Sequence, residues 1–164
     1  MALEIRTFGD PVLKSPATLV DKFDESLEQL TQDMLETMRG HEGVGLAANQ
    51  VGRLKRILVA ALEDEEYVVV NPEINDCGDE TGTEYEGCLS IPEIQVEVER
   101  PIRITVSGQN QAGEPVRLEA VGLLARILQH EVDHLNGVLI LDRTDRESRK
   151  TAMRELRERL LAQR

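Results

Sequence analysis

The stretch Gln129-His130-Glu131-Val132-Asp133-His134-Leu135-Asn136-Gly137 places two of the three histidines of the chain four positions apart, with a glutamate between them. In an α-helix, residues i and i+4 lie one turn apart on the same face, so both imidazoles can reach one metal ion. Glu131 directly follows His130 and can lean toward a water on that ion. The pattern is typical of a metallohydrolase, and two histidines that simply pack on a helix are the plainer alternative.

Apolar residues surround this motif on its N-terminal side. Polar groups are costly among apolar neighbours unless they are paired or bind a metal. Gly137 after Asn136 is a favourable helix stop, so a helix from Ala120 to Asn136 should end just past the second histidine. An apolar surface almost all round predicts that this helix is buried in the middle of a domain, and it is formed by Val121, Leu123, Leu124, Ala125, Ile127, Leu128, Val132 and Leu135.

The composition predicts one soluble domain over residues 1–164. A chain of 164 residues is long enough for one well-formed core and short for two. Its 40% hydrophobic and 30% charged residues are typical of a globular protein. No run of about 18 apolar residues predicts a membrane span, and the first six residues lack the form of a signal peptide. We therefore expect a cytoplasmic protein with no membrane partner.

The charge is spread unevenly along the chain. The formal net charge of −12 argues against a broad nucleic-acid-binding surface, so DNA is not an expected partner. Residues 146–164 nevertheless carry a net charge of +4, with three acidic residues against seven basic ones. The sequence therefore predicts a basic C-terminal helix, whose cations are Arg146, Arg149, Lys150, Arg154, Arg157, Arg159 and Arg164.

The remaining patterns indicate an α+β fold. Asp24 has the character of a helix N-cap, and apolar residues then recur at helical spacing until Gly40. Alternating apolar and polar residues predict half-buried strands further along the chain. We expect a single domain of antiparallel β-sheets packed around the buried helix, with the basic helix on the outside. The predicted strands are residues 56–62, 67–71, 94–100, 102–106 and 115–120.

A third metal ligand is needed, because catalytic zinc or iron sites usually take three protein ligands and leave one position for water. His41 lies at the end of the first predicted helix, where a surface or capping role is favoured. Cys88 is the better candidate, since its polar neighbours include Glu86 and a thiolate with two imidazoles suits zinc or iron. Cys77, in a polar stretch expected to be a loop from residue 77 to 82, is expected to be incidental.

Three segments, Gly43–Gln50, Glu86–Ser90 and Gln129–His134, resemble in order and approximate spacing the signature motifs of the peptide deformylase family. Asp10–Leu13 and Val138–Arg143 are also similar to that family, so the resemblance covers the chain to about residue 145. It implies removal of the formyl group from the N-formylmethionine of new bacterial proteins, with release of formate. The implied cofactor is Fe²⁺, and Zn²⁺, Ni²⁺ or Co²⁺ can occupy the same site.

The resemblance also implies a mechanism. Cys88, His130 and His134 would bind the ion and leave one position for water. The ion would lower the pKa of that water, so that hydroxide can attack the formyl carbon. Glu131 would take the proton from the water and pass it to the departing amine as general base and acid.

The negative charge of the tetrahedral intermediate needs hydrogen-bond donors. By resemblance, these are the side-chain amide of Gln50 and the backbone N–H of Leu89. The methionine side chain needs an apolar pocket, and Leu123 and Ile127 share the face of the helix that carries His130. Packing alone would also explain these side chains. The full set of expected substrate-binding residues is Val44, Gly45, Leu89, Leu123, Arg126 and Ile127, with Arg126 at the rim.

Further residues have open roles. Glu86 and Asp133 are expected to orient ligand nitrogens or an arginine such as Arg100, and ordinary surface acids are the alternative. The tract Gly43–Gln50 is either a plain turn or a backbone surface that receives an extended peptide. The basic helix is either a solvated face or, as the resemblance implies, a site that contacts the ribosome.

Two rival functions remain open from the sequence. A zinc metalloprotease with the same His-Glu-x-x-His pattern would take its third ligand downstream, for example Glu155. A catalytically inactive relative could bind peptides or ribosomes, although the intact Cys88, His130, Glu131 and His134 argue against it.

Overall fold

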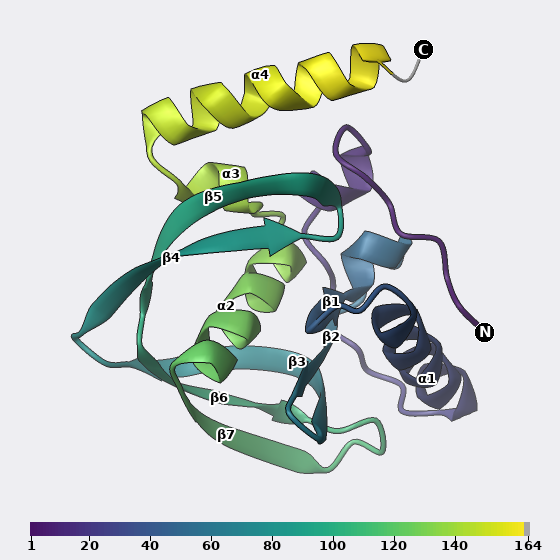
Figure 1. The fold of residues 1–164 in the computed structure, drawn as a ribbon. Coiled ribbons are helices and arrows are strands. Elements are labelled where there is room, and N and C mark those ends of the chain that lie inside the picture. Colours follow the sequence, from purple (N-terminus) through teal and green to yellow (C-terminus); the bar gives the residue numbers. More distant parts are fainter. Residues whose placement is uncertain (163–164) are drawn as a thin grey trace.

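The structure is a computed structural model that describes residues 1–162 (Figure 1). Residues 163–164 of the predicted C-terminal helix lie outside the described residues. In chain order the elements are η1 (Pro11–Lys14), α1 (Glu25–Gly40), β1 (Gly45–Ala47), η2 (Ala48–Val51), β2 (Ile57–Leu62), β3 (Glu65–Cys77), β4 (Thr81–Cys88), β5 (Ile91–Pro101), β6 (Arg103–Gln109), β7 (Pro115–Val121), α2 (Leu123–Leu135), α3 (Ile140–Arg143) and α4 (Arg146–Ala162).

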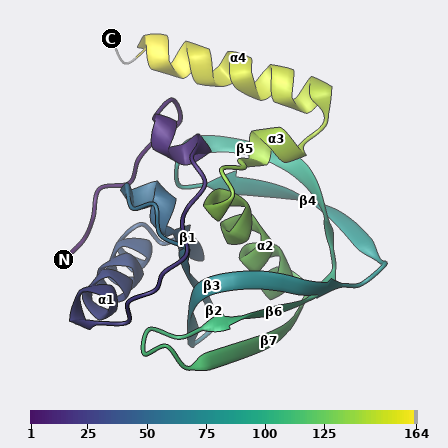
Figure 2. The ribbon, with the colours of Figure 1, turned by 180° about the vertical axis from the view of Figure 1, so that it is seen from behind.

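Two antiparallel sheets enclose one helix. Five strands pair in the order β1-β2-β3-β6-β7, and β4 and β5 form a separate two-stranded sheet. Figure 1 shows α2 between the β4–β5 hairpin above and strands β6 and β7 below, and Figure 2 shows the same layers from behind. Helix α4 lies on the outside, next to the hairpin. The predicted α+β architecture, with antiparallel sheets around a buried central helix, is confirmed.

The central helix begins three residues later than its apolar pattern predicts. Ala120 and Val121 pair with Ile104 and Arg103 as the last residues of β7. Gly122 then turns the chain with a φ of 67°, a conformation that L side chains rarely adopt, and α2 starts at Leu123. The apolar run thus serves a strand and a helix in succession, because both are buried against the same core.

The other predicted elements have shifted boundaries. Helix α1 has the predicted bounds, and Asp24 accepts a hydrogen bond from the backbone N–H of Leu27 as its N-cap. Strand β3 runs from Glu65 to Cys77, longer than the predicted strand at both ends. The stretch predicted as a loop from 77 to 82 is therefore only residues 78–80, and Cys77 is exposed at the end of the strand.

Separate hydrophobic clusters support the two sheets. Ala125, Leu128 and Val132 of α2 pack with residues of the five-stranded sheet such as Leu58 and Ile104. The inward side chains of the hairpin pack instead with α3 and α4, in a cluster of Leu13, Ile91, Ile94, Val96, Val98, Leu139, Ile140, Leu141, Ala152 and Leu156.

The small-residue tract Gly43–Gln50, which follows α1, is not a plain turn. Gly45–Ala47 forms the edge strand β1, which pairs with β2, and Ala48–Val51 forms a 3-10 turn that carries Gln50. An edge strand has one set of backbone groups free to pair with another chain.

Among the described helices, none combines the length and the apolar character that crossing a membrane would require.

Candidate active site

Three candidate metal ligands converge between the hairpin and α2. Cys88 ends β4, while His130 and His134 lie one turn apart on α2. The Nε2 atom of His134 lies 3.3 Å from the Sγ atom of Cys88 and 3.2 Å from the Nε2 atom of His130. Ligands bonded to one tetrahedral ion at about 2.0–2.3 Å lie a little more than 3 Å apart. The donor set and its spacing therefore fit a divalent metal ion.

Glu86 fixes the orientation of His130. Its Oε1 atom lies 2.9 Å from Nδ1 of His130, and both its oxygens accept hydrogen bonds from Arg100. Burial acts to raise the pKa of Glu86, but the hydrogen bonds from His130 and Arg100 outweigh it and hold the pKa at about 2. Because the carboxylate is ionised and can only accept, Nδ1 of His130 donates to it, and Nε2 is the ring nitrogen left for the ligand position.

Asp133 is connected to the candidate metal ligands through other side chains. Its carboxylate accepts hydrogen bonds from Arg100 at 2.9 Å and from Arg143 at 2.8 and 3.0 Å. This carboxylate accepts no hydrogen bond from a histidine among the residues that the structure describes, so its link to His130 runs through Arg100 and Glu86. Arg143 was not predicted from the sequence, and its place at the end of the four-residue helix α3 gives no signal of this contact.

Glu131 is buried beside β1. The residue is only 4% exposed, and its Oε1 atom is buried with no hydrogen-bond partner among the described residues. A Cβ atom on Gly45 would lie 2.5 Å from Oε2 of Glu131, so any residue other than glycine at this position would clash with the carboxylate as it is placed. Burial raises the pKa of Glu131 to about 7, and the nearby His130 opposes that rise.

The amide of Gln50 is fixed beside the ligands. Its Oε1 atom accepts a hydrogen bond of 3.0 Å from the backbone N–H of Ala47. Its Nε2 atom donates to Oγ of Ser90 at 3.1 Å and lies 3.5 Å from Sγ of Cys88. The amino side of the amide therefore faces the candidate metal site. The sequence indicates no role for Ser90, but its full burial explains why the hydroxyl needs this partner.

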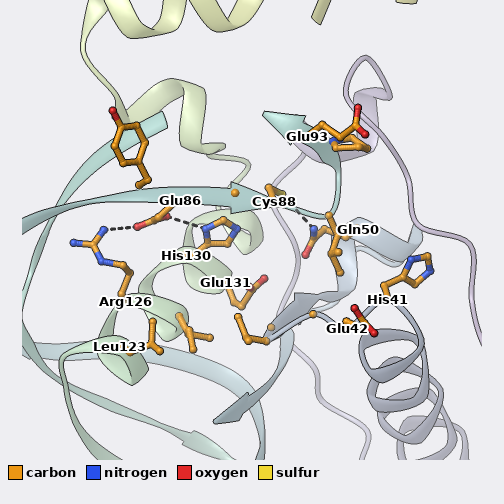
Figure 3. Close-up of a pocket in the computed structure, with 18 residues that line it drawn as sticks. His41, Glu42, Gln50, Glu86, Cys88, Glu93, Leu123, Arg126, His130 and Glu131 are labelled. Atoms are coloured by element: carbon orange, nitrogen blue, oxygen red, sulfur yellow. Dashed lines mark hydrogen bonds and ion pairs between the residues drawn. The ribbon is translucent and has the colours of Figure 1, made fainter. Parts of the chain in front are cut away.

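A cavity of about 530 Å³ opens over these residues (Figure 3). Leu123 and Val44, which are 56% and 52% exposed, lie at its mouth, and Ile127 is buried in its wall. All expected substrate-binding residues line this cavity, namely Val44, Gly45, Leu89, Leu123, Arg126 and Ile127. The lining also includes His41, for which only a surface or capping role was favoured.

Glu155, the third ligand that a metalloprotease would need, lies elsewhere. It is exposed on α4, beside Gln95 and Val96 of β5 in a different surface hollow. The metal-ligand group that the described residues form around His130 and His134 contains Cys88 and not Glu155. The geometry thus favours a Cys-His-His site over the metalloprotease arrangement.

The family model described as polypeptide deformylase matches residues 2–150 of this chain. The chain belongs to the peptide deformylase family. The peptide deformylase of Dictyoglomus thermophilum is 50% identical over 151 residues, which cover 92% of this chain and 98% of that protein. Relatives at this identity are peptide deformylases, so the chain is an enzyme of this class of metallohydrolases.

Solved structures of the family have the same fold. The crystal structure of peptide deformylase from Thermotoga maritima superposes with a TM-score of 0.87 and 51% identity, and covers 88% of this chain and 99% of that one. A peptide deformylase from Ehrlichia chaffeensis in complex with actinonin gives a TM-score of 0.92 and 38% identity, over 96% of this chain and 97% of the other. The family model ends at residue 150, so most of α4 lies beyond it.

Proposed function

We propose that this deformylase removes the formyl group from the N-formylmethionine at the start of newly made proteins and releases formate. The observation that carries the proposal is the convergence of Cys88, His130 and His134 beside Glu131 and Gln50. A divalent ion held by the three ligands, Fe²⁺ in our proposal, would supply an activated water and polarise the formyl oxygen. Zn²⁺, Ni²⁺ or Co²⁺ suit the same ligands.

Both sheets and α2 contribute to the site, which supports a single catalytic domain over residues 1–164.

Glu131 carries the proton in this mechanism. It takes the proton from the attacking water and gives it to the departing amine as the C–N bond breaks. Its carboxylate lies in the cavity wall on the same helix as the two histidine ligands, and it is free of ion pairs among the described residues.

Gln50 and Leu89 stabilise the negative charge that develops on the formyl oxygen. The amide of Gln50 is held by Ala47 and Ser90, so it is oriented before the substrate arrives. Leu89 follows Cys88 directly and lines the same cavity, which supports its backbone N–H as the second donor. Such preorganised donors are each worth about 2.7–4 kcal/mol.

The substrate enters as an extended chain. The edge strand β1 lines the cavity at Gly45 and offers main-chain groups that bind a peptide without reading its sequence. The methionine side chain fills the apolar part of the cavity at Leu123 and Ile127. The complex of the Ehrlichia chaffeensis enzyme with actinonin supports ligand binding by this fold.

The proposal is tested by incubating the purified protein, prepared without oxygen, with a formyl-Met-Ala-Ser peptide. We expect one formate and one free amino terminus per peptide. The acetylated analogue should not be hydrolysed at a comparable rate. Cleavage of an internal peptide bond in place of formate release would favour the metalloprotease. Binding without any product would favour an inactive relative.

A ribosome contact through α4 is the second part of the proposal. Arg146, Lys150, Arg154 and Arg157 recur at helical spacing on α4, are exposed, and have no acidic partner within residues 1–162. Arg149 and Arg159 are instead paired with Asp142 and Glu93. A row of free cations on an acidic protein suits the phosphates of ribosomal RNA.

Charge reversal tests this contact. Replacing Lys150 and Arg154 with glutamate should weaken co-sedimentation with ribosomes and reduce the dependence of binding on salt, while turnover of a short peptide is kept. Arg117→Glu on β7, also an exposed arginine, is the matched control and should leave ribosome binding unchanged. Equal binding of all three proteins would contradict a role for α4.

A further inference from the structure

The candidate metal ligands come from two parts of the molecule that pack in different hydrophobic clusters. Cys88 lies on the hairpin, whose apolar side chains pack with α3 and α4. His130 and His134 lie on α2, whose apolar side chains pack with the five-stranded sheet. Hydrophobic packing is not directional, so polar contacts between the hairpin and α2 must set how closely the three ligand atoms meet.

Arg126 makes the most extensive of these contacts. It lies on α2 one turn before His130, and its side chain is only 13% exposed. The Nη1 atom donates to Oε2 of Glu86 at 2.6 Å and to the carbonyl of Val98 at 2.9 Å, and Nη2 donates to the carbonyl of Gly82 at 2.8 Å. One guanidinium therefore binds both strands of the hairpin, through Val98 on β5 and through Gly82 and Glu86 on β4.

Figure 3 shows how this contact continues to the ligands. The guanidinium of Arg126 is directed to Glu86, and the carboxylate of Glu86 is directed in turn to His130. Cys88 lies two residues after Glu86 on the same strand. A shift of the hairpin along α2 would therefore move the thiolate and the partner of His130 together.

We propose that Arg126 is a positioning residue of the metal site, which holds the β4–β5 hairpin in register with α2 so that Cys88 meets His130 and His134. This inference rests on the proposed function only through the identity of the three ligands. It replaces the substrate-binding role predicted for Arg126 from the sequence. The long side chain still forms part of the cavity wall, but its guanidinium binds the hairpin and not the substrate.

The surrounding charges make the inference testable without unfolding the protein. Glu86 keeps its two hydrogen bonds from Arg100 when Arg126 is removed, so no buried carboxylate is left without a counter-charge. Arg126→Met keeps most of the aliphatic stem in the wall and loses the three hydrogen bonds. Arg126→Lys keeps the charge and one donor direction, but it cannot span two carbonyls and a carboxylate.

The experiment measures the release of Co²⁺ from the loaded enzyme to an excess of chelator, together with the visible spectrum of the bound ion. We expect Arg126→Met to release the ion about tenfold faster than the wild type, in line with losses from outer hydrogen bonds to metal ligands. The spectrum should change, and Arg126→Lys should lie between the two. KM for a formyl-Met peptide should stay within about twofold, because the cavity wall is kept.

Arg117→Met is the matched control, since it removes an exposed arginine with one ion pair and should leave metal release unchanged. Metal release at the wild-type rate in both Arg126 variants would overturn the inference, and an increased KM alone would restore the substrate-binding role. If Arg126→Met does not fold, Arg126→Lys decides by the same comparison. Metal release needs no substrate, so absence of formate would contradict the proposed function and leave this inference standing.

Discussion

The Nδ1 atom of His130 lies 2.9 Å from the Oε1 atom of Glu86, on the side of the imidazole opposite the Nε2 atom that faces His134. This one contact decides the tautomer of the ring, because an ionised carboxylate can only accept a hydrogen bond. The buried arginine that binds Glu86 keeps that carboxylate ionised. Nε2 is then the ring nitrogen that is left to bind a metal ion.

Glu86→Gln should weaken metal binding, because a neutral amide neither enforces this tautomer nor balances Arg100 and Arg126. We expect a loss of about 10- to 100-fold in affinity for Zn²⁺ or Co²⁺, measured by competition with a chromogenic chelator. Glu84→Gln, an exposed neighbour on β4, is the control and should bind the ion as the wild type does. Equal affinities in both variants would remove Glu86 from the account of the site.

Gly45→Ala should impair catalysis while the metal is retained. The added Cβ atom would lie 2.5 Å from Oε2 of Glu131, which must move. Because a displacement of about 1 Å can cost about 100-fold in rate, we expect kcat to fall by that order. Gly40→Ala, whose Cβ would meet nothing within 4 Å, is the matched control for steady-state kinetics. An unchanged kcat in Gly45→Ala would show that Glu131 is not required in its observed position.

Gln50→Leu should lower kcat by about 100- to 1000-fold and leave the metal content intact, because the amide is not a ligand and its loss removes one oxyanion donor. Metal analysis and formate release on the same preparation separate the two effects. Loss of the metal would reassign Gln50 to the support of Cys88, from which its Nε2 atom lies 3.5 Å.

Leu156→Ala should destabilise the fold by about 2–5 kcal/mol, because this side chain is 6% exposed and packs in the hairpin cluster. Leu161→Ala, five residues later and 59% exposed, should change the free energy of unfolding by less than about 0.5 kcal/mol. Urea denaturation followed by circular dichroism measures both. Equal stabilities would mean that α4 does not support the hairpin.

Much of the candidate site could be predicted because its signals are local. The spacing of His130 and His134 has a direct meaning on a helix, and the neighbouring Glu86 favoured Cys88 over Cys77 as the third ligand. The structure brings these three side chains together. The fold class and the bounds of α1 followed from periodicity and capping, which act within a few residues.

Not every contact that holds the site together could be predicted. The sequence indicated that Glu86 and Asp133 could bind an arginine such as Arg100, but it did not indicate that Arg126 binds Glu86 across 40 positions of the chain or that Arg143 binds Asp133. Nothing in local spacing distinguishes an arginine that binds substrate from one that binds the hairpin. The start of α2 was placed too early for a related reason, since an apolar run looks the same in a buried strand as in a buried helix.

The central claim is that deformylation depends on one ion held by Cys88, His130 and His134, and metal titration tests it most directly. Metal-free protein would be titrated with Fe²⁺ without oxygen, and formate release from a formyl-Met peptide measured at each step. We predict that activity rises linearly to a maximum at one ion per chain, and that Cys88→Ala recovers none of it. Full activity of the metal-free protein, or of Cys88→Ala, would contradict the account.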